Sequence, residues 1–545
     1  MNRTTRLGLS VLTGLLLGLS WPLFGFTPLI FVAFFPLLKL EHYFATNPDK
    51  FKTKTIFWYA YLAFFTWNLV ATWWVYEASF GGAAFAFVFN SLFMALTFMF
   101  AHAVKRRIFK KELQQGQINF LMYVPFILFW VSFEYFHTNW QLAYPWLTLG
   151  NGLAGEHKWI QWYEFTGVFG GSLWILCANV LFFIYILKKE FILKLKSRML
   201  WRFLAHVLVP IGISLGIYFS YNNNSKKDAK SYKIVVVQPN VDPYKEKFTI
   251  PYEEQLEKML KLAETKLDSS TDYLVFPETA LTEDVWENDI NKNSSVIVLH
   301  DFMKKYPKLV LITGASTSKV FNEGEKLSET AQKFKDADQY YDNYNTALQF
   351  DHSGKIQVYH KSKLVPGVER MPFPSLLKPL EKLALDLGGT VGSLATQEDR
   401  TPLVSPANAK VAPIICYESI FSEFVSEYVK NGAQALFIIT NDGWWGDTPG
   451  YKQHLVYGRL RTIETRKCIA RSANTGISCF INERGDISQM TDWWKPAVIS
   501  AELPFNDTVT FYVKHGDYIA RAAVFLSLLL IVYALLIRFN ILKKA

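Results

Sequence analysis

Residues 410–419 read KVAPIICYES, an apolar run that ends in Cys416 and continues directly into a tyrosine and a glutamate. A short apolar run of this kind is typical of a buried β-strand, and α/β domains place reactive side chains at the ends of such strands. A cysteine nucleophile needs a base that takes its proton and a positive group that stabilises the oxyanion formed on attack. The run therefore predicts that a carboxylate and an ammonium group lie at other strand ends.

Two further apolar runs end in groups of these types. YLVFPE, residues 273–278, ends in Glu278, and KIQVYHK, residues 355–361, ends in Lys361. A carboxylate can act as the general base, and a lysine can stabilise both a thiolate and an oxyanion. On residue types alone an ordinary explanation stays open, with a loop glutamate, a solvated lysine and a core cysteine.

The same region carries more runs of this kind, separated by segments with helical spacing. The other apolar runs lie at 233–241, 308–317, 344–351, 435–442 and 469–482, and the helical segments near 252–268, 289–305, 417–430 and 451–466. Strands this apolar, interleaved with helices, predict an α/β domain whose sheets are buried.

The rest of the chain is dominated by longer apolar segments, several of which approach the ~20 residues that cross a bilayer core. They lie at 7–22, 25–40, 56–77, 83–104, 118–136, 163–187, 202–220 and 518–538. We interpret the first as a retained helix, because no clear cleavage site follows it. The prediction is a polytopic α-helical membrane domain of about eight transmembrane helices. Its seven-helix part spans 1–220, the soluble domain 221–515, and the last helix with its tail 516–545.

The charge distribution supports this division. The chain has 545 residues, of which 50% are hydrophobic and 19% charged, with a net charge of +10. Lysines and arginines gather beside apolar segments, near 50–54, 105–111, 188–198 and 538–544, whereas the loops around 78–82 and 137–162 contain few. This arrangement favours a membrane surface over nucleic acid. Since all basic loops fall on one side, which is the cytoplasmic side, the soluble domain is expected on the opposite side.

Three short segments carry a family resemblance. FPET (276–279), YHKSKLVP (359–366) and PIICYES (413–419) resemble, in order, the motifs around the catalytic residues of the nitrilase, or carbon–nitrogen hydrolase, superfamily, and NDGWWG (441–446) resembles a later motif. The resemblance implies an αββα sandwich in which Glu278, Lys361 and Cys416 are the catalytic residues, and it requires no metal and no cofactor.

The helices on either side of the soluble domain point to one family within this superfamily. Together with PETAL (277–281), YNTAL (344–348) and YPWLTLGN (144–151), they are similar to the apolipoprotein N-acyltransferase family of Gram-negative bacteria. The resemblance implies an enzyme that forms a thioester on Cys416 with an acyl chain from a membrane phospholipid. The enzyme then transfers this chain to the α-amino group of the diacylglyceryl-cysteine of apolipoproteins, the last step of lipoprotein maturation. We expect a multi-pass inner-membrane monomer whose catalytic domain faces the periplasm.

The resemblance also suggests further site residues. Glu369 and Glu418 look like the family's supporting glutamates, and the backbone N–H of Tyr417 is expected to stabilise the oxyanion with Lys361. Trp444 and Trp146 are candidates for substrate binding, because amphipathic rings favour a lipid interface. A solvent-exposed acid is the alternative for either glutamate, and an ordinary interfacial aromatic is the alternative for Trp146.

Two other functions remain open on the sequence. One is a membrane-bound amidase or nitrilase that acts on a small substrate with the same triad. The other is a transporter or receptor with a degenerate domain, against which stands the absence of an obvious buried ionic pair in the predicted spans, Glu134 excepted.

The remaining cysteines and histidines suggest no further chemistry. Cys468 and Cys479 could form a disulfide, although two buried thiols are favoured. We interpret His360 and His454 as ordinary polar residues, because neither has the spacing of a metal ligand.

Overall fold

The computed structural model describes residues 1–78, 80–188, 193–221, 230–247, 249–371, 373, 394–539 and 541. Most of the predicted linker, 222–229, and parts of two basic segments, 189–192 and 542–545, lie outside the described residues. The chain divides into two compact units. The helical unit comprises Met1–Tyr76, Phe80–Ser220 and His515–Ala545, and the sheet unit comprises Glu77–Ser79 and Tyr221–Lys514.

The helical unit is built from long apolar helices. These are α1 (Arg3–Leu19), α2 (Phe35–Thr46), α3 (Thr55–Thr72), α6 (Ser91–Ile108), α8 (Val124–Thr138), α9 (Tyr163–Lys188), α10 (Leu193–Ser220) and α17 (Tyr518–Arg538). Shorter pieces connect them: η1 (Thr27–Phe31), α4 (Val75–Ala78), α5 (Phe80–Phe85), η2 (Ala86–Asn90), α7 (Lys110–Gln114), η3 (Phe120–Tyr123), η4 (Pro145–Leu147) and η5 (Leu149–Trp159).

Six helical stretches among the described residues are long and apolar enough to cross a membrane. They are Thr27–Thr46, Gly81–Ile108, Phe120–Thr138, Tyr163–Lys188, Arg198–Ser220 and Tyr518–Arg538. The other two predicted spans correspond to α1 and α3, which have 17 and 18 residues. A polytopic helical domain is therefore present, and the count of eight transmembrane helices stays a prediction.

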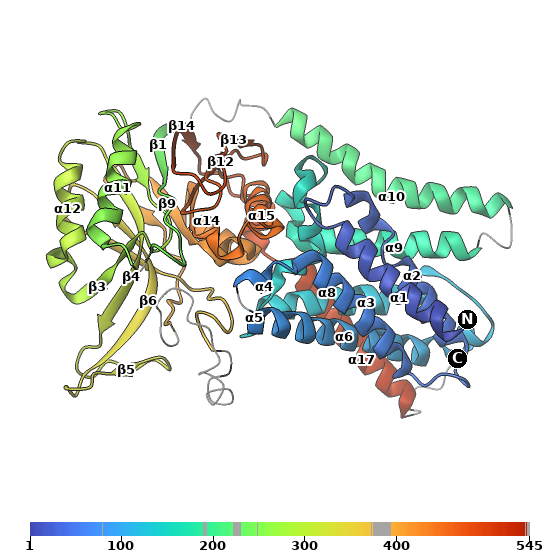
Figure 1. Ribbon diagram of the computed structural model, residues 1–545. Helices are drawn as coiled ribbons and strands as arrows, with labels where there is room; N and C mark the ends of the chain where they lie inside the picture. Colours follow the sequence, from blue (N-terminus) through green and yellow to red (C-terminus); the bar gives the residue numbers. More distant parts are fainter. Residues whose placement is uncertain are drawn as a thin grey trace. The chain divides into compact units, whose positions relative to one another are not determined.

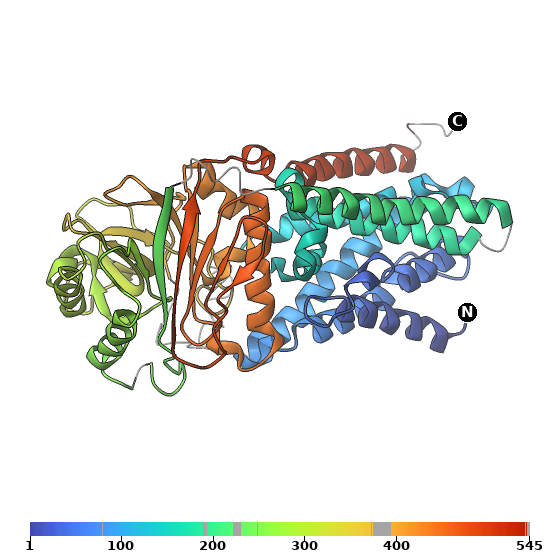
Figure 2. The same cartoon turned by 90° about the horizontal axis from the view of Figure 1, so that it is seen from above.

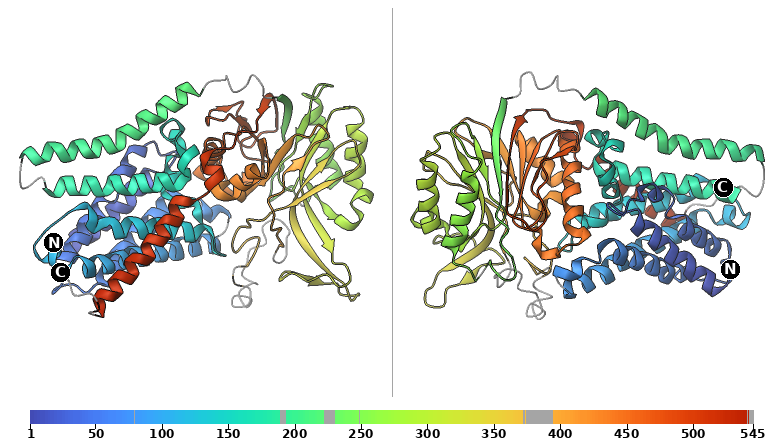
Figure 3. Two further views of the ribbon diagram at one scale, coloured as in Figure 1. Left: turned by 180° about the vertical axis from the view of Figure 1, so that it is seen from behind. Right: turned by 45° about the horizontal axis from the view of Figure 1, so that its top comes forward.

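Close backbone approach and polar contacts join these helices. A Cβ atom on Gly14 of α1 would lie 2.4 Å from the carbonyl oxygen of Ala63 in α3, so only glycine permits this approach. The last helix, α17, lies against α6 and α8 (Figure 3), and the hydroxyls of Ser527 and Ser132 are 3.0 Å apart. Residues from both ends of the chain thus form one bundle.

A buried ionic cluster lies inside the helical unit. Glu41 of α2 is 2.7 Å from Nδ1 of His102 and 2.6 Å from Nζ of Lys105, both on α6. The Lys105 ammonium also lies 3.6 Å from the centre of the Tyr123 ring. The expectation that the spans lack a buried ionic pair is therefore wrong. The predicted spans ended at residues 40 and 104, whereas α2 continues to Thr46 and α6 to Ile108, which places Glu41 and Lys105 within helices.

The sheet unit contains two sheets. The first has the order β14-β1-β2-β4-β6-β5, with β3 paired to β4 and β7 to β6, and the second has the order β13-β12-β11-β10-β9-β8. The strands of the first sheet are β1 (Lys230–Gln238), β2 (Tyr273–Val275), β3 (Leu281–Trp286), β4 (Val310–Val320), β5 (Gln332–Lys333), β6 (Tyr340–Phe350), β7 (Gln357–His360) and β14 (Ala497–Phe505). Those of the second are β8 (Leu403–Val404), β9 (Lys410–Ile415), β10 (Ala435–Thr440), β11 (Ile469–Ala473), β12 (Cys479–Ile481) and β13 (Ile487–Ser488).

Helices cover the outer face of each sheet (Figures 1 and 2). The helical segments of this unit are α11 (Tyr252–Glu264), η7 (Glu287–Lys292), α12 (Ser294–Met303), η9 (Cys416–Ile420), α14 (Ser422–Lys430), η10 (Asp442–Trp445) and α15 (Pro449–Thr465), and α16 (Phe511–His515) follows β14. The first sheet lies between α11 and α12 on one side and the second sheet on the other, with α14 and α15 beyond. The predicted αββα sandwich is therefore confirmed.

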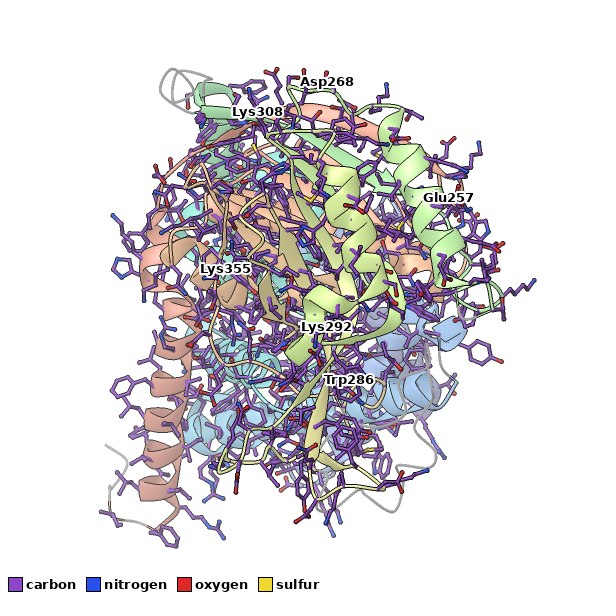
Figure 4. The ribbon with its side chains drawn as sticks, turned by 90° about the vertical axis from the view of Figure 1, so that its left-hand side faces the viewer. Glu257, Asp268, Trp286, Lys292, Lys308 and Lys355 are labelled. Atoms are coloured by element: carbon purple, nitrogen blue, oxygen red, sulfur yellow. The ribbon has the colours of Figure 1, made fainter. Side chains whose placement is uncertain are left out.

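Amphipathic helices explain this layering. Leu256, Met259, Leu260 and Ala263 recur at helical spacing on α11 and are buried against apolar residues of the first sheet. The opposite face of this layer is charged, and Figure 4 shows labelled residues such as Glu257 and Lys292 on the outside of the unit. The two central strand runs, β1-β2-β4 and β9-β10-β11, are parallel and buried.

Candidate active site

Three strand ends bring the predicted triad residues into the sheet unit. Glu278 lies three residues beyond β2, Lys361 follows β7 directly, and Cys416 follows β9 directly as the first residue of η9. Their side chains are buried, with exposed fractions of 6%, 1% and 9% respectively. The structure therefore excludes the ordinary explanation in which Lys361 is a solvated lysine.

Lys361 lies between two carboxylates. Its Nζ is 3.1 Å from Oε1 of Glu278 and 2.8 Å from Oε1 of Glu369. The side-chain amide of Asn345 donates to the same two oxygens, at 2.8 and 3.1 Å, and the backbone N–H of Asn441 donates to the other oxygen of Glu278 at 3.1 Å. Two carboxylates therefore share one ammonium group, with their orientation fixed by amide donors.

The pKa values of the pair move in opposite directions. Burial alone would raise the pKa of Glu278, but the charge of Lys361 and the Asn345 hydrogen bond outweigh it and bring that pKa below its usual range. Burial would lower the pKa of Lys361, yet the charges of Glu278 and Glu369 raise it well above its usual range. At neutral pH the site thus holds an ionised base beside an ammonium group.

Cys416 lies within the field of these charges. Burial raises the pKa of its thiol, the charge of Glu278 raises it further, and Lys361 opposes both effects. Cys416 is therefore a thiol at neutral pH, with the ionised carboxylate of Glu278 acting on it. Its backbone has a φ of 49°, an uncommon left-handed conformation for a residue that is not glycine.

Two side chains hold the carbonyl oxygen of Cys416. The hydroxyl of Ser419 donates to it at 2.8 Å, and Nε2 of His454 lies 3.1 Å from it. His454 also reaches Asp442, with 2.9 Å between Nδ1 and Oδ1, and Arg471 donates to the other Asp442 oxygen. His454 is therefore part of a buried network and not the ordinary polar residue that we predicted.

The side chain of Glu418 connects the end of β7, which precedes Lys361, with the end of β9, which precedes Cys416. It is fully buried, so the alternative of a solvent-exposed acid is wrong for this residue. One of its oxygens accepts hydrogen bonds at 2.7 Å from the Tyr359 hydroxyl and the Ser362 backbone, and the other accepts one at 2.8 Å from the Ile415 backbone. Burial raises the pKa of Glu418 to about 6, although these hydrogen bonds oppose the shift.

Glu369 contacts Lys361 of the predicted triad, and Tyr417 directly follows Cys416 in the chain. The second oxygen of Glu369 accepts a hydrogen bond from the Val365 backbone at 2.8 Å, so a tight turn presents its first oxygen to Lys361. Tyr417 follows Cys416 in η9, and its buried ring lies 5.3 Å from the Phe421 ring.

The two candidate substrate-binding tryptophans occupy different units. Trp444, in η10 of the sheet unit, is half-buried, and its ring stands edge-on to Tyr244 at 5.2 Å. Trp146, in η4 of the helical unit, is buried against Trp74, with 4.8 Å between the ring centres.

Sequence reasoning missed a second buried lysine beside the base. Nζ of Lys247, in the segment after β1, donates to the hydroxyl of Thr279, the residue that follows Glu278. Burial lowers the pKa of Lys247 to about 8, opposed by the charge of Glu278. Sequence reasoning also missed Asn345, although this residue lies within the YNTAL segment, residues 344–348. Motif resemblance could flag that segment, but only the pairing of β6 with β7 shows that Asn345 faces the carboxylates.

The four cysteines are separate thiols in the structure. Cys479 lies on β12 opposite Arg471 of β11, and Cys468 directly precedes β11. Among the described residues, no group of three or more histidine, cysteine or acidic side chains is arranged to hold a metal ion.

Comparisons with known proteins match two parts of this chain to protein families. Residues 234–511 match the family model for carbon–nitrogen hydrolases, and residues 13–181 match the model for the N-terminal domain of apolipoprotein N-acyltransferases. Among solved structures, yeast Nit3, a member of branch 10 of the nitrilase superfamily, is 17% identical with a TM-score of 0.37, covering 50% of this chain and 90% of that one.

Two relatives match over nearly their full length, and both are apolipoprotein N-acyltransferases. The apolipoprotein N-acyltransferase of Chlorobaculum tepidum is 30% identical over 529 residues, which is 94% of this chain and 93% of that protein. Its counterpart in Geobacter metallireducens is 26% identical over 528 residues, or 95% and 92% of the two chains. With both domains matched and nearly the whole length covered, this membrane protein belongs to the apolipoprotein N-acyltransferase family.

Proposed function

We propose that this enzyme transfers an acyl chain from a membrane phospholipid, through a thioester on Cys416, to the α-amino group of a lipid-modified N-terminal cysteine. The observation that carries the proposal is the buried lysine shared by two carboxylates next to a thiol, at the ends of β7, β2 and β9. It supplies a base, a positive group and a nucleophile within one site.

In the first half-reaction the thiol attacks the ester carbonyl of the phospholipid. The S–H proton passes to Glu278 as the S–C bond forms, and Lys361 and the Tyr417 N–H stabilise the oxyanion. The ester C–O bond then breaks, and Glu278 returns the proton to the departing lysophospholipid. Because the resting cysteine is a thiol, proton transfer accompanies attack and does not precede it.

In the second half-reaction the α-amino group attacks the thioester. Glu278 accepts a proton from the amine as the C–N bond forms and returns it to the sulfur as the C–S bond breaks, which restores the Cys416 thiol and the ionised carboxylate. Glu369 fixes Lys361 during both halves, and Glu418 fixes the strand end from which the nucleophile emerges. The name of the family and the apolar helices of the helical unit support an acceptor and a donor that are both membrane-anchored.

The remaining assignments extend this proposal. We assign Trp444 and Trp146 to contacts with the acyl chains or the lipid, since each places an amphipathic ring in a segment shared with the family's motifs. The basic clusters beside the helices support an inner-membrane orientation with the sheet unit in the periplasm. The enzyme is proposed to act as a monomer without nucleic acid.

The test is intact-mass analysis of purified protein after incubation with phosphatidylethanolamine vesicles. The expected result is one added acyl chain on the wild type, none on Cys416→Ser, and loss of the chain when a diacylglyceryl-cysteine peptide is added. Hydrolysis of a small amide without acyl transfer from phospholipid would contradict the proposal and favour an amidase.

A further inference from the structure

The carbonyl oxygen of the nucleophile is held by a closed chain of polar side chains. The hydroxyl of Ser419 is 2.8 Å both from this oxygen and from Nε2 of His454, and that nitrogen is itself 3.1 Å from the oxygen. Nδ1 of His454 is 2.9 Å from Oδ1 of Asp442. We call these three residues the Asp442–His454–Ser419 chain.

The far end of the chain is anchored by a buried ion pair. Asp442 accepts hydrogen bonds from the Thr440 hydroxyl at 2.8 Å and from Arg471. The charges of Arg471 and His454 outweigh the effect of burial and lower the pKa of Asp442 to about 2. Asp442 is therefore an anion that orients the imidazole so that Nε2 faces Ser419 and the Cys416 carbonyl.

The order of groups resembles a serine hydrolase triad, but its surroundings exclude a second nucleophile. Ser419 and His454 each have an exposed fraction of 1%, and Asp442 has none. The Ser419 hydroxyl lies against the back of the nucleophile's own peptide group, where no acyl ester can reach it. The chain therefore acts on the peptide group that it contacts.

That peptide group joins Cys416 to Tyr417. It is planar and trans, so its C=O and N–H point in opposite directions. Hydrogen bonds to the oxygen fix the plane of the peptide, and they also polarise it, which strengthens its N–H as a donor. The Ser419 hydroxyl, which donates to the Cys416 carbonyl, thus controls the direction and the strength of the Tyr417 N–H, and His454 fixes the position of that hydroxyl.

We propose that the Asp442–His454–Ser419 chain is a positioning device for the oxyanion site, which orients and polarises the Cys416–Tyr417 peptide so that its N–H meets the tetrahedral intermediate. The inference rests on the acyl transfer proposed above. Ser419 and His454 are positioning residues, because they act through the peptide. Asp442 orients His454, and its charge also raises the pKa of the Cys416 thiol.

The test compares two reactions of the same sulfur. Acylation by phospholipid forms an oxyanion, whereas alkylation by iodoacetamide displaces iodide and forms none. For Ser419→Ala and for His454→Gln we expect acyl-enzyme formation to slow about 10-fold, less than the ~10²–10³-fold loss for a direct oxyanion donor. Alkylation should stay within about twofold of wild type, since the thiol and its base are unchanged.

Two further variants serve as controls. Ser419→Thr keeps the hydroxyl and should restore acylation. Ser426→Ala removes another buried serine, whose hydroxyl donates to the Glu423 carbonyl on α14 at 2.7 Å, and should change neither reaction. If one variant does not fold, as judged by thermal denaturation, the other still provides the comparison.

Two outcomes would overturn the inference. One is acylation at the wild-type rate in both variants, and the other is an equal loss of acylation and alkylation, which would show a displaced nucleophile. A wild-type protein that is alkylated but never acylated by phospholipid would instead refute the proposed function itself.

Discussion

Each unit of the protein buries a lysine among ionisable groups, and the two clusters differ in their charge balance. In the helical unit Lys105 meets one carboxylate, that of Glu41, beside His102. In the sheet unit Lys361 meets two carboxylates, those of Glu278 and Glu369. Lys105 thus contacts one carboxylate and Lys361 two, and we call the first cluster balanced and the second unbalanced in this sense. Lys247, which donates to Thr279, adds a second positive charge near Glu278.

This difference separates a structural cluster from a chemical one. In a balanced buried pair, protonating the carboxylate would remove the only partner of the ammonium group. Removing either residue likewise leaves one buried ion without compensation. In the unbalanced cluster one carboxylate can accept a proton while Lys361 keeps the other as its ionised partner. The Cys416 thiol, on which the charge of Glu278 acts, can supply that proton. Substitutions in the two clusters should therefore affect different quantities.

The largest effect is expected when the base of the unbalanced cluster is neutralised. Glu278→Gln keeps the size of the side chain but removes the proton acceptor, so acyl-enzyme formation should fall about 10³-fold. Single-turnover mass spectrometry with phospholipid measures the rate, and the melting temperature should change little. Glu257→Gln, on the exposed face of α11, is the control. A rate within tenfold of wild type would show that another group takes the proton.

In the balanced cluster the corresponding change should affect stability. Lys105→Met leaves Glu41 buried without its ammonium partner, which should lower the free energy of unfolding by about 3–5 kcal/mol. The acylation rate per folded molecule should not change. Denaturation in detergent measures the stability, and Lys110→Met, on the exposed side of α7, is the control. Adding Glu41→Leu should restore most of the loss, and failure to do so would contradict the assignment of a balanced pair.

The second lysine beside the base should affect the pH dependence. The charges of Lys361 and Lys247 oppose burial and keep the pKa of Glu278 low, and the rate falls as the pH drops through that pKa. Lys247→Met removes one positive charge, so the pKa of Glu278 rises and the acidic limb of the acylation rate moves to higher pH. At pH values well above this acidic limb, the acylation rate should change little.

Rates of acylation measured from acidic to mildly alkaline pH test this expectation. Lys247→Arg should restore the wild-type limb because it restores the charge, and Lys245→Met, which alters an exposed neighbour, should leave the limb in place. A limb that moves to lower pH would contradict the sign of the argument.

The smallest effect is expected for cysteines that lie away from the unbalanced cluster. Burial raises the pKa of Cys479 to about 12, and Cys468 is 1% exposed. Cys468→Ser and Cys479→Ser should therefore leave acylation within about twofold of wild type. Peptide mapping of the native protein after brief alkylation of the sheet unit's cysteines should find the label on Cys416. Faster labelling of Cys468 or Cys479 than of Cys416 would contradict the idea that the cluster around Lys361 makes the neighbouring cysteine reactive.

Local sequence predicted the parts of the fold that depend on local patterns. Apolar runs and helical spacing predicted β1, β2, β4, β9 and β10, together with the helices between them. By contrast, β14 was missed, because most of its side chains are only half-buried and it contains Pro504. Its nine residues form a strand through pairing with β1, which lies more than 250 residues earlier in the chain. Such long-range pairing leaves no local pattern in the sequence.

The site shows the same limit. Glu278, Lys361 and Cys416 became candidates because each ends an apolar run, but the motifs of a known family were needed to select them as catalytic residues and to add Glu369 and Glu418. Lys247 and His454 were not predicted as site residues, because a lysine or histidine in a polar segment has the same local sequence pattern whether it is solvated or buried. Their importance comes from contacts with residues more than 30 positions away in the chain, Thr279 for Lys247 and the Cys416 carbonyl for His454.

The pairing of β1 with β14 has a consequence for the ancestry of the chain. Lys230, at the start of the first strand, lies opposite Phe505, at the end of the last, so the sandwich begins and ends at neighbouring points, about 5 Å apart. A module with adjacent ends can be inserted into a host at a single loop without stretching either partner. Apart from the three residues Glu77–Ser79, the sheet unit interrupts the helical sequence between α10 and α17. A single recombination event that placed a hydrolase cassette into a helical membrane protein would thus suffice to create this architecture.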